Sequence, residues 1–344
     1  MSFAGTNKMT NMRSLWHGIT CLFLLTLGGA AQAQSEFTYN GVVDFSYGRF
    51  EPSGFYRNYQ FNSNSLSATF VGGTFKHGLD DGWTPGVTLE TFIRLQDLRT
   101  GRRDTDPLLS RNAFVFLNSK YGNVKVGRLQ TLLFDTTTRF NALGNSVVFS
   151  PAVKHVFASG NLEGVQGDFY WNRAGAYTSP TYEGITANVM YAKGSHEQDG
   201  DYAGANVVMS RGLFAAALSV QHAYVNDGIE DPTKETTWQL GATYNFGLAR
   251  VFGLYTQTRD LGLEVNSKIT SGGFSFPLGP GSVLMQMGYT TATGLAVDRK
   301  HTSTSAGYLY PYDSQTDLYV LTMDDRIRGQ TRGVSVAGGA RIKF

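Results

Sequence analysis

The chain has 344 residues, of which 41 are glycine; aromatic residues make up 13% of it and charged residues 16%. Sparse charge together with many tyrosines and phenylalanines excludes an intrinsically disordered chain. The glycines follow no three-residue period, which excludes collagen, and no apolar run reaches about 18 residues, so no transmembrane helix is predicted. These proportions favour an all-β protein.

Residues 1–33 have the pattern of a secretory signal peptide. Arg13 precedes a short apolar run, and the small residues needed at a cleavage site end at Ala33. We expect cleavage there, with residues 34–344 as the mature domain; Met12 is an alternative start. The leader carries two of the 29 basic residues, none of the 27 acidic ones and the single cysteine. The mature chain therefore has a formal net charge of zero, which gives no support to nucleic-acid binding, and it can form no disulfide scaffold.

The mature chain is dominated by alternation of apolar and polar residues with a period of two. In the last segment, for example, Val334 and Val336 share one face while Ser335 and Arg341 share the other. Such runs are typical of β-strands with one apolar and one polar face. The pattern predicts sixteen strands, which in chain order cover residues 37–49, 65–76, 86–97, 111–121, 123–131, 168–179, 183–193, 201–210, 213–224, 235–246, 249–259, 268–276, 282–292, 303–311, 316–324 and 333–344.

The connections between these strands alternate between long and short. The predicted long ones cover residues 50–64, 98–110, 132–167, 194–200, 225–234, 260–267, 293–302 and 325–332. A tight turn at every second connection is typical of an up-and-down barrel with unequal rims, and closure satisfies every backbone group in hydrocarbon, where water cannot. We therefore predict a sixteen-stranded antiparallel transmembrane β-barrel with a water-filled lumen. A water-soluble β protein is the alternative that gives the same alternation.

Aromatic residues gather near the predicted strand ends, where a membrane would meet water. Their amphipathic rings suit the two interfacial girdles of a transmembrane barrel, whereas in a water-soluble protein they would form a core. The predicted girdle residues are Tyr47, Phe50, Trp83, Tyr121, Tyr224, Trp238, Phe246 and Phe344.

Several short motifs occur in an order that points to one family. They are FTYNGVVD at 37–44, RNAFV at 111–115, YGNVKVGR at 121–128, YTSP at 177–180 and DLY at 317–319, followed by the carboxy-terminal Phe344. With these motifs the mature chain resembles the sixteen-stranded general porins of Gram-negative outer membranes, most closely the neisserial and betaproteobacterial type. Each motif is weakly specific alone, and their order and spacing carry the resemblance.

The resemblance implies a protein of the outer membrane that assembles as a homotrimer and passes small hydrophilic solutes by diffusion. Its implied partners are outer-membrane lipid and lipopolysaccharide, and the barrel-insertion machinery that reads Phe344; nucleic acid is not among them, and no cofactor or metal is implied. The third outer loop, here residues 132–167, would fold into the lumen and narrow it. In the family, acidic residues on this loop face a ladder of wall arginines, and the field between them orients polar solutes.

The charged residues of the expected constriction depart from this pattern. Arg128 matches one wall arginine, but two other arginine positions fall at Gly72 and near Tyr170, with Arg173 close by. The charged constriction residues expected on the loop itself are Asp135, Arg139, Lys154, His155 and Glu163. A loop that is more basic than acidic predicts a weak transverse field and a preference for aromatic or anionic solutes.

The middle of this loop is apolar, with Val147, Val148, Phe149 and Phe157. One interpretation is that these residues make the constriction itself apolar. The other is that they anchor the loop against the barrel wall. The sequence leaves both open.

Two wall arginines are predicted to point into the lumen. An arginine that faces mid-bilayer lipid costs about 2–4 kcal/mol, so we expect an inward Arg128. Strict alternation then turns Val124 and Val126 inward as well, unless a bulge at Gly127 resets the register. Arg94 falls on the polar face of its own strand and is the second candidate.

Motifs of enzymes are absent from the sequence. It contains no Gly-x-Ser-x-Gly elbow, no phosphate-binding loop and no paired-histidine metal spacing. The acidic pair Asp324–Asp325 is interpreted as solvated charge at a strand end. The leading hypothesis is a diffusion channel, either general or solute-specific. A surface adhesin or recognition protein on a barrel anchor is the alternative, and mostly short outer loops favour the channel.

Overall fold

The structure is a computed structural model that describes residues 34–157, 163–165, 168–194, 200–225 and 233–344. The predicted signal peptide, residues 1–33, and parts of three predicted outer loops lie outside the described residues. The sheet is antiparallel and is made of the segments β1 (Gln34–Phe50), β2 (Asn58–Ser63), β3 (Phe70–Gly78), β4 (Thr84–Arg94), β5 (Arg99–Thr100), β6 (Ala113–Ser119), β7 (Gly122–Gln130), β8 (Tyr170–Thr178), β9 (Ile185–Ala192), β10 (Tyr202–Arg211), β11 (Phe214–Val225), β12 (Thr233–Asn245), β13 (Arg250–Asp260), β14 (Val265–Leu278), β15 (Gly281–Thr293), β16 (Asp298–Pro311), β17 (Thr316–Ile327) and β18 (Gly333–Lys343).

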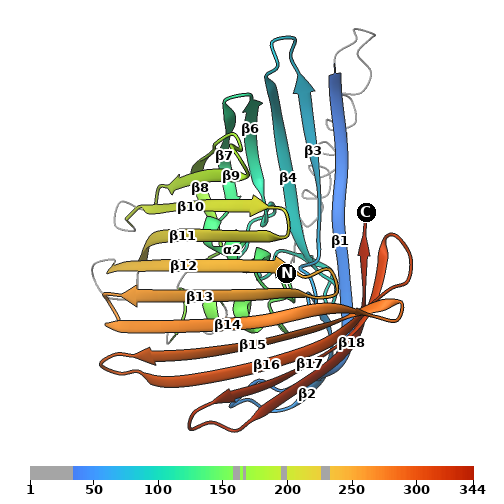
Figure 1. Cartoon of the computed structure of the whole chain (residues 1–344), viewed down its shortest axis with the longest axis vertical. Coiled ribbons are helices and arrows are strands. Elements are labelled where there is room, and N and C mark those ends of the chain that lie inside the picture. The colour runs from blue at the N-terminus through green and yellow to red at the C-terminus, as the bar shows by residue number, and fades with distance from the viewer. Residues whose placement is uncertain (1–33, 158–162, 166–167, 195–199, 226–232) are drawn as a thin grey trace, which may run out of the picture.

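The sheet closes on itself at β1, which pairs with strands from both ends of the chain (Figure 1). On one side Val42 lies opposite Lys343 of β18; on the other side the first half of β1 pairs with β3 and the second half with β2. β2 and β3 are therefore two parts of one wall strand, and the two-residue β5 only extends a loop hairpin. The described wall thus has sixteen strands, which confirms the predicted barrel.

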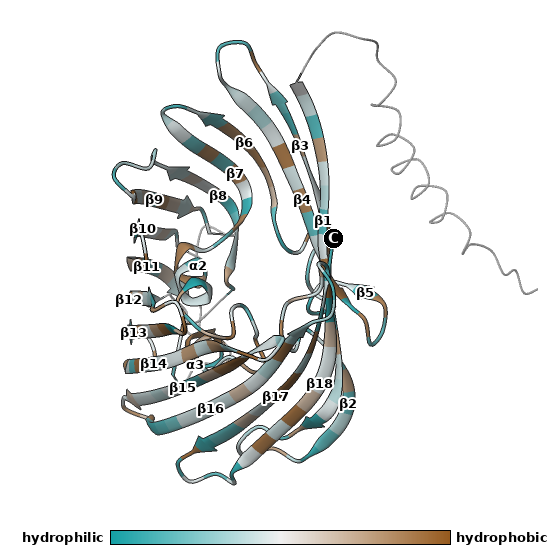
Figure 2. Cartoon of the chain, turned by 45° about the vertical axis from the view of Figure 1, so that its right-hand side comes forward, coloured by the Kyte–Doolittle hydropathy of each residue, from teal (hydrophilic) through white to brown (hydrophobic). Residues whose placement is uncertain are grey.

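The two faces of the wall follow the predicted alternation, and Figure 2 shows apolar and polar residues alternating along the strands. In β1, Phe37, Tyr39 and Phe45 are exposed on the outer face, whereas Asp44 and Ser46 are buried on the inner face. Successive side chains of a strand point to opposite faces, so this pattern gives an apolar outside and a polar inside. The outer face suits lipid, as a membrane barrel requires.

The outer connections of the second half of the chain are shorter than predicted. Only residues 261–264 join β13 to β14, and only residues 294–297 join β15 to β16. The prediction was wrong there because β14 begins at Val265 and β16 at Asp298, ahead of the regular alternation on which the predicted strand bounds depended. Polar residues such as Asn266 and Ser267 belong to the strand ladder, where the sequence suggested a loop.

Near the start of the chain, the second wall strand is interrupted. Residues 64–69 leave the ladder between β2 and β3, and the backbone N–H groups of Ser65, Leu66 and Ser67 donate hydrogen bonds to the carboxylate of Asp44. The strand predicted over residues 65–76 therefore starts at Phe70, and β2 lies inside a predicted loop.

The predicted aromatic girdle is wrong at one position. Phe50 shares the inner face of β1 with Asp44 and Ser46, and only 8% of it is exposed. Its ring centroid lies 6.1 Å from that of Phe149, a residue of the long loop. By contrast, Tyr121 remains exposed, as do Tyr47, Trp238, Phe246 and Phe344, whereas Trp83 and Tyr224 are half-buried.

The long third outer loop lies inside the barrel. It contains α2 (Leu132–Arg139) and α3 (Pro151–Phe157), and both helices sit on the concave side of the wall in Figure 2. α2 packs against β9–β12 and α3 against β14–β16. Thr131 caps α2 by accepting a hydrogen bond from the backbone N–H of Phe134, and a proline begins α3. Neither helix is long and apolar enough to cross a membrane.

Candidate constriction of the lumen

Apolar residues of the loop are buried against the inner wall. Phe149 is fully buried in a cluster with Phe50 of β1 and with Leu321 and Met323 of β17. Phe157 is partly buried in a second cluster. These contacts support the interpretation in which the apolar middle of the loop anchors it to the wall.

Two wall glycines leave room for the loop. A Cβ atom at Gly241 of β12 would lie 2.6 Å from the ring of Phe140, which is itself fully buried. A Cβ atom at Gly288 of β15 would lie 2.9 Å from the Cβ atom of Pro151. Any larger side chain at either position would collide with the loop, so these glycines determine where the loop can rest.

His155 joins α3 to the wall by hydrogen bonds. Its Nδ1 lies 2.6 Å from the hydroxyl of Thr290, and its Nε2 lies 2.8 Å from the hydroxyl of Ser303. Its ring stacks on that of His301, with centroids 3.9 Å apart. Burial, with a further contribution from His301, holds the pKa of His155 well below its usual range. His155 is thus a neutral anchoring group and adds no cation to the lumen.

A buried ion-pair network continues from this anchor. The Nζ atom of Lys154 lies 2.7 Å from the carboxylate of Asp325, and the same carboxylate lies 2.7 Å from Nε2 of His301. The other ring nitrogen of His301 lies 2.6 Å from Glu163, which is also 3.2 Å from Arg299. The loop is therefore fixed to β16 and β17 by alternating charges.

The interpretation of Asp324–Asp325 as a solvated pair is wrong for Asp325, which is buried. Only 2% of Asp325 is exposed, because β17 continues to Ile327 and turns this carboxylate inward. Asp324 faces the other way and pairs with Arg326 and Arg332. Extending the period-two pattern past residue 324 would have placed Asp325 on the inner face.

The network contains groups that resemble other kinds of site. His155, Glu163 and His301 offer ligand atoms within 4.8 Å of one another, a spacing that could hold a metal ion. All their ring nitrogens already have partners, however, and Arg299 supplies positive charge beside the carboxylate.

Nor does this network form a hydrolase triad. Ser303 donates its hydrogen bond to Asp325, and both residues lie at the same nitrogen of His301. Glu163 lies at the opposite nitrogen of His301, as the acid of a triad would, but Ser303 is fully buried and gives its proton to Asp325 rather than to His301. The arrangement therefore serves to hold the loop.

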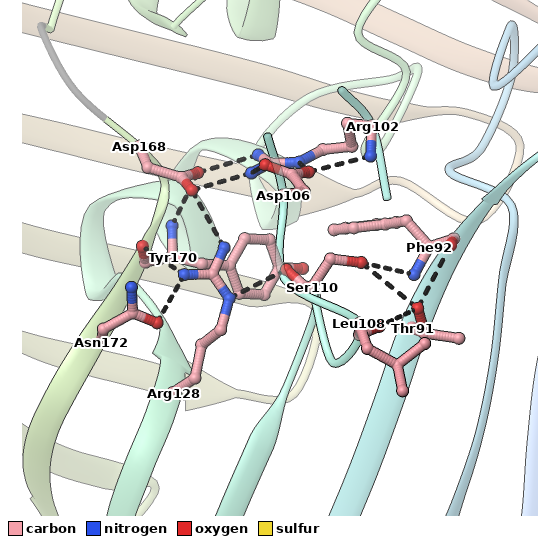
Figure 3. Close-up of polar contacts among 10 residues, drawn as sticks. All are labelled: Thr91, Phe92, Arg102, Asp106, Leu108, Ser110, Arg128, Asp168, Tyr170 and Asn172. Carbon is pink, nitrogen blue, oxygen red and sulfur yellow. Dashed lines mark hydrogen bonds and ion pairs between the residues drawn. The ribbon is translucent and has the colours of Figure 1, made fainter. Parts of the chain in front are cut away.

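Arg128 lies in a second cluster, shown in Figure 3. Its guanidinium is 7% exposed and donates hydrogen bonds to the carbonyl of Ser110 at 2.9 Å, to Asn172 at 2.8 Å and to Asp168 at 3.0 Å. The ladder between β7 and β8 is irregular between Gly127 and Leu129, and Gly127 has a φ of 145°. This is the bulge that the sequence left open as one alternative, and every polar contact of Arg128 is made within the protein.

Asp168 holds this cluster together. Arg102 donates two hydrogen bonds of 2.8 Å to its carboxylate, and Arg128 approaches the same group (Figure 3). Burial alone would raise the pKa of Asp168, but the hydrogen bonds and charges of the two arginines lower it. Tyr170 is 3% exposed beside them and donates its hydroxyl to Gln130 at 3.0 Å. The position near which the family has a wall arginine is thus filled by a buried aromatic residue.

Arg94, the second predicted wall arginine, and Arg173, the arginine near Tyr170, lie outside this cluster. Arg94 pairs with Asp97 and Asp104 in the outer loop after β4. Arg173 occupies the irregular part of β8 with a φ of 50° and adds to the charge beside Asp201. Within the described chain, neither arginine pairs with a residue of α2 or α3.

Two of the predicted loop residues stay accessible in the lumen. Asp135 of α2 is exposed and accepts a hydrogen bond from Gln130 at 3.3 Å. Arg139, one turn later, is exposed and donates to the hydroxyl of Ser210 on the inner face of β10 at 2.8 Å. On the wall, Lys125 lines the same cavity as Asp135, and it points inward because Val124 and Val126 on either side are exposed on the outer face. Lys125 was not predicted as a lumen residue, although outward-facing Val124 and Val126 would have identified it.

Known proteins resemble this one along most of its length. Outer membrane porin protein 32 of Delftia acidovorans is 27% identical over 314 residues, which cover 88% of this chain and 87% of the relative. The solved anion-selective porin from Comamonas acidovorans superposes with a TM-score of 0.76 and 22% identity, covering 90% of this chain and 100% of that one. A trimer form of Vibrio cholerae OmpT, an outer membrane protein, gives a TM-score of 0.69 with 12% identity, covering 90% and 99%.

A family profile decides the classification. The profile described as Gram-negative porin matches residues 20–330. Together with the closed barrel and the apolar outer face, this match places the protein in the outer membrane as a channel rather than an enzyme, and it does not favour the adhesin alternative. The chain belongs to the Gram-negative porin family, as its motifs indicated.

Proposed function

We propose that this outer-membrane channel passes small hydrophilic solutes by diffusion and prefers anions over cations. The observation that carries the proposal is an imbalance of unpaired charge in the lumen. Lys125, Arg139 and Arg250 line the described lumen and form no ion pair. Against them stands Asp135, an accessible carboxylate; the other described carboxylates of the inner face are paired or buried.

The imbalance acts on ions because the lumen is narrow and its walls have a low dielectric constant. Unpaired charge in such a channel concentrates ions of the opposite sign, whereas paired charge has little effect beyond its immediate neighbours. Salt screens the effect, since the Debye length is about 10 Å at 0.1 M. The description of a structural relative as an anion-selective porin supports the same direction.

We assign separate roles to the predicted constriction residues. Asp135 and Arg139 line the narrowest part, while Lys154, His155 and Glu163 hold the loop in place. Arg128 and Tyr170 stabilise the base of the loop, and Arg94 and Arg173 act outside the constriction. What supports this division is which side chains stay accessible in the lumen and which are buried in polar contacts.

The reversal potential in a salt gradient across a planar bilayer tests the ion preference. We expect the wild-type channel to favour chloride over potassium, Arg139→Gln to reduce this preference and Asp135→Asn to increase it. Arg211→Gln is the matched control, because Arg211 is exposed at a short turn and pairs with Glu183. Potassium preference in the wild-type channel would overturn the proposal.

We further propose that the channel is a homotrimer. An outer-membrane relative has a solved trimer form, and the apolar outer wall can face either lipid or a neighbouring subunit. Light scattering of the detergent-solubilised protein tests this, with three chains per particle expected. A single chain per particle at every concentration would contradict it.

The two ends of the chain complete the proposal. Residues 1–33 act as a cleaved leader, which mass spectrometry of the protein from outer membranes would confirm by a first residue of Gln34. The carboxy-terminal Phe344 exchanges backbone hydrogen bonds with Gly41 of β1, at 2.9 and 3.2 Å. We propose that the insertion machinery reads this terminal residue before the bonds form, and that lipid and lipopolysaccharide then surround the wall.

A further inference from the structure

A cavity of about 310 Å³ lies between α2 and the inner face of β6–β9. Its size falls within the range of small-molecule binding sites. Phe114, Leu129, Leu132 and Met190 supply its apolar part. A passing solute could therefore leave bulk water here and bury an apolar group beside the constriction.

The cavity also presents two unpaired charges of opposite sign. Lys125 lies at one part of the lining, with its Nζ atom 5.4 Å from the ring centroid of Phe114. Asp135 lies at another part, on the first turn of α2. The two side chains do not come within ion-pair distance of each other, so neither neutralises its counterpart. Arg111, the other cation in the lining, is already paired with Glu90.

We propose that this cavity binds a small zwitterion with an apolar side chain, that is, a free α-amino acid such as phenylalanine. The carboxylate of the solute pairs with Lys125, its ammonium group pairs with Asp135, and its side chain packs on Phe114 and Met190. A solute with one charge leaves either Lys125 or Asp135 without a partner. Such a loss weakens binding by about tenfold, as expected for one hydrogen bond to a charged group.

This site goes beyond ion preference, and the two are measured separately. Ion preference is read from the reversal potential, whereas solute binding is read from the decrease of the ion current as solute is added. A channel without anion preference can still bind the zwitterion, and an anion-preferring channel can fail to bind it.

Current blockade by three related solutes tests the proposal on the full channel in a planar bilayer. L-Phenylalanine carries both charges, phenethylamine only the ammonium group and 3-phenylpropionate only the carboxylate. We expect phenylalanine to block the current in a saturable manner. Each analogue should need about a tenfold higher concentration, because it makes one charged contact fewer.

Two variants test which charged group of the solute pairs with Lys125 and which pairs with Asp135. Lys125→Gln should make phenylalanine and phenethylamine equally effective, and Asp135→Asn should make phenylalanine and 3-phenylpropionate equally effective. Lys125→Arg, which keeps the charge, and Lys76→Gln, which removes a lysine outside the cavity, should leave the wild-type order unchanged. Absence of saturable blockade in a conducting wild-type channel would overturn the proposal. So would equal blockade by all three solutes, or variants that leave their order unchanged.

Discussion

Truncation of Phe149 should loosen the constriction without opening the barrel. Phe149 is fully buried and packs on Phe50, Leu321 and Met323, so replacing it by alanine removes apolar burial and leaves a cavity. Changes of this kind cost about 3–5 kcal/mol. The wall ladder does not involve this side chain, so the loss falls on the docking of the loop. The ratio of undocked to docked loop should rise about a hundredfold or more.

Single-channel recording measures this effect directly. Phe149→Ala should show a higher conductance or frequent steps between two conductance levels, because the loop leaves the wall more often. Phe149→Leu keeps much of the volume and should show a smaller change. Phe246→Ala is the matched control, since Phe246 is 64% exposed on a short turn. A Phe149→Ala channel that folds and conducts like the wild type, with equal current noise, would refute the reasoning.

Three further predictions concern the contacts that hold the loop and its base. Gly241→Ala places a Cβ atom 2.6 Å from the ring of Phe140. This overpacking should destabilise the docked loop by about 1–3 kcal/mol and so increase current noise. Gly253→Ala, whose Cβ atom would meet no atom within 4 Å, is the control and should leave current noise unchanged. Asp168→Asn removes the carboxylate between Arg102 and Arg128. The free energy of unfolding in urea should fall by about 1–2 kcal/mol, allowing for the partial exposure of Asp168. An unchanged midpoint of urea unfolding would show that these ion pairs do not stabilise the protein. Burial lowers the pKa of His155 below its usual value near 6.5, so the undocked loop takes up a proton that the docked loop excludes. The contribution of His155 to docking should therefore weaken as the pH falls below about 6.5, by up to about 1.4 kcal/mol per pH unit. Current noise should rise more with acid in the wild type than in His155→Gln, and equal acid responses would contradict this.

The wall was predictable because its physical causes are local. Alternation along each strand reports which face meets lipid; it identified sixteen strands, and it placed Val336, which is exposed, opposite Ser335, which is buried. The same rule failed at Phe50, where an inward aromatic residue meets the loop rather than lipid. The identity of a residue alone does not distinguish an apolar side chain that meets lipid from one that packs on the loop inside the barrel.

The contacts of the loop were only partly predictable, because they join residues far apart in the sequence. The basic residues Lys154 and His155 were identified as constriction residues, but their partners Asp325 and Thr290 lie more than 130 positions away. A sequence shows that a charge exists and not whether it is already neutralised. That information comes only from the folded wall, and it reduces the accessible charge on the described part of the loop to Asp135 and Arg139.

Closure of the barrel at β1 constrains the order of assembly. The seam joins Gly41 to Phe344, so almost the whole mature chain must be in place before β1 can pair with β18. Contacts between such distant residues are slow to form, because a long loop of chain has to be ordered first. The loop must also reach β14–β16, which follow it in the sequence and come together after it. The loop helices α2 and α3 therefore have to enter the partly assembled barrel before β1 pairs with β18, or pass through the open end of the barrel afterwards.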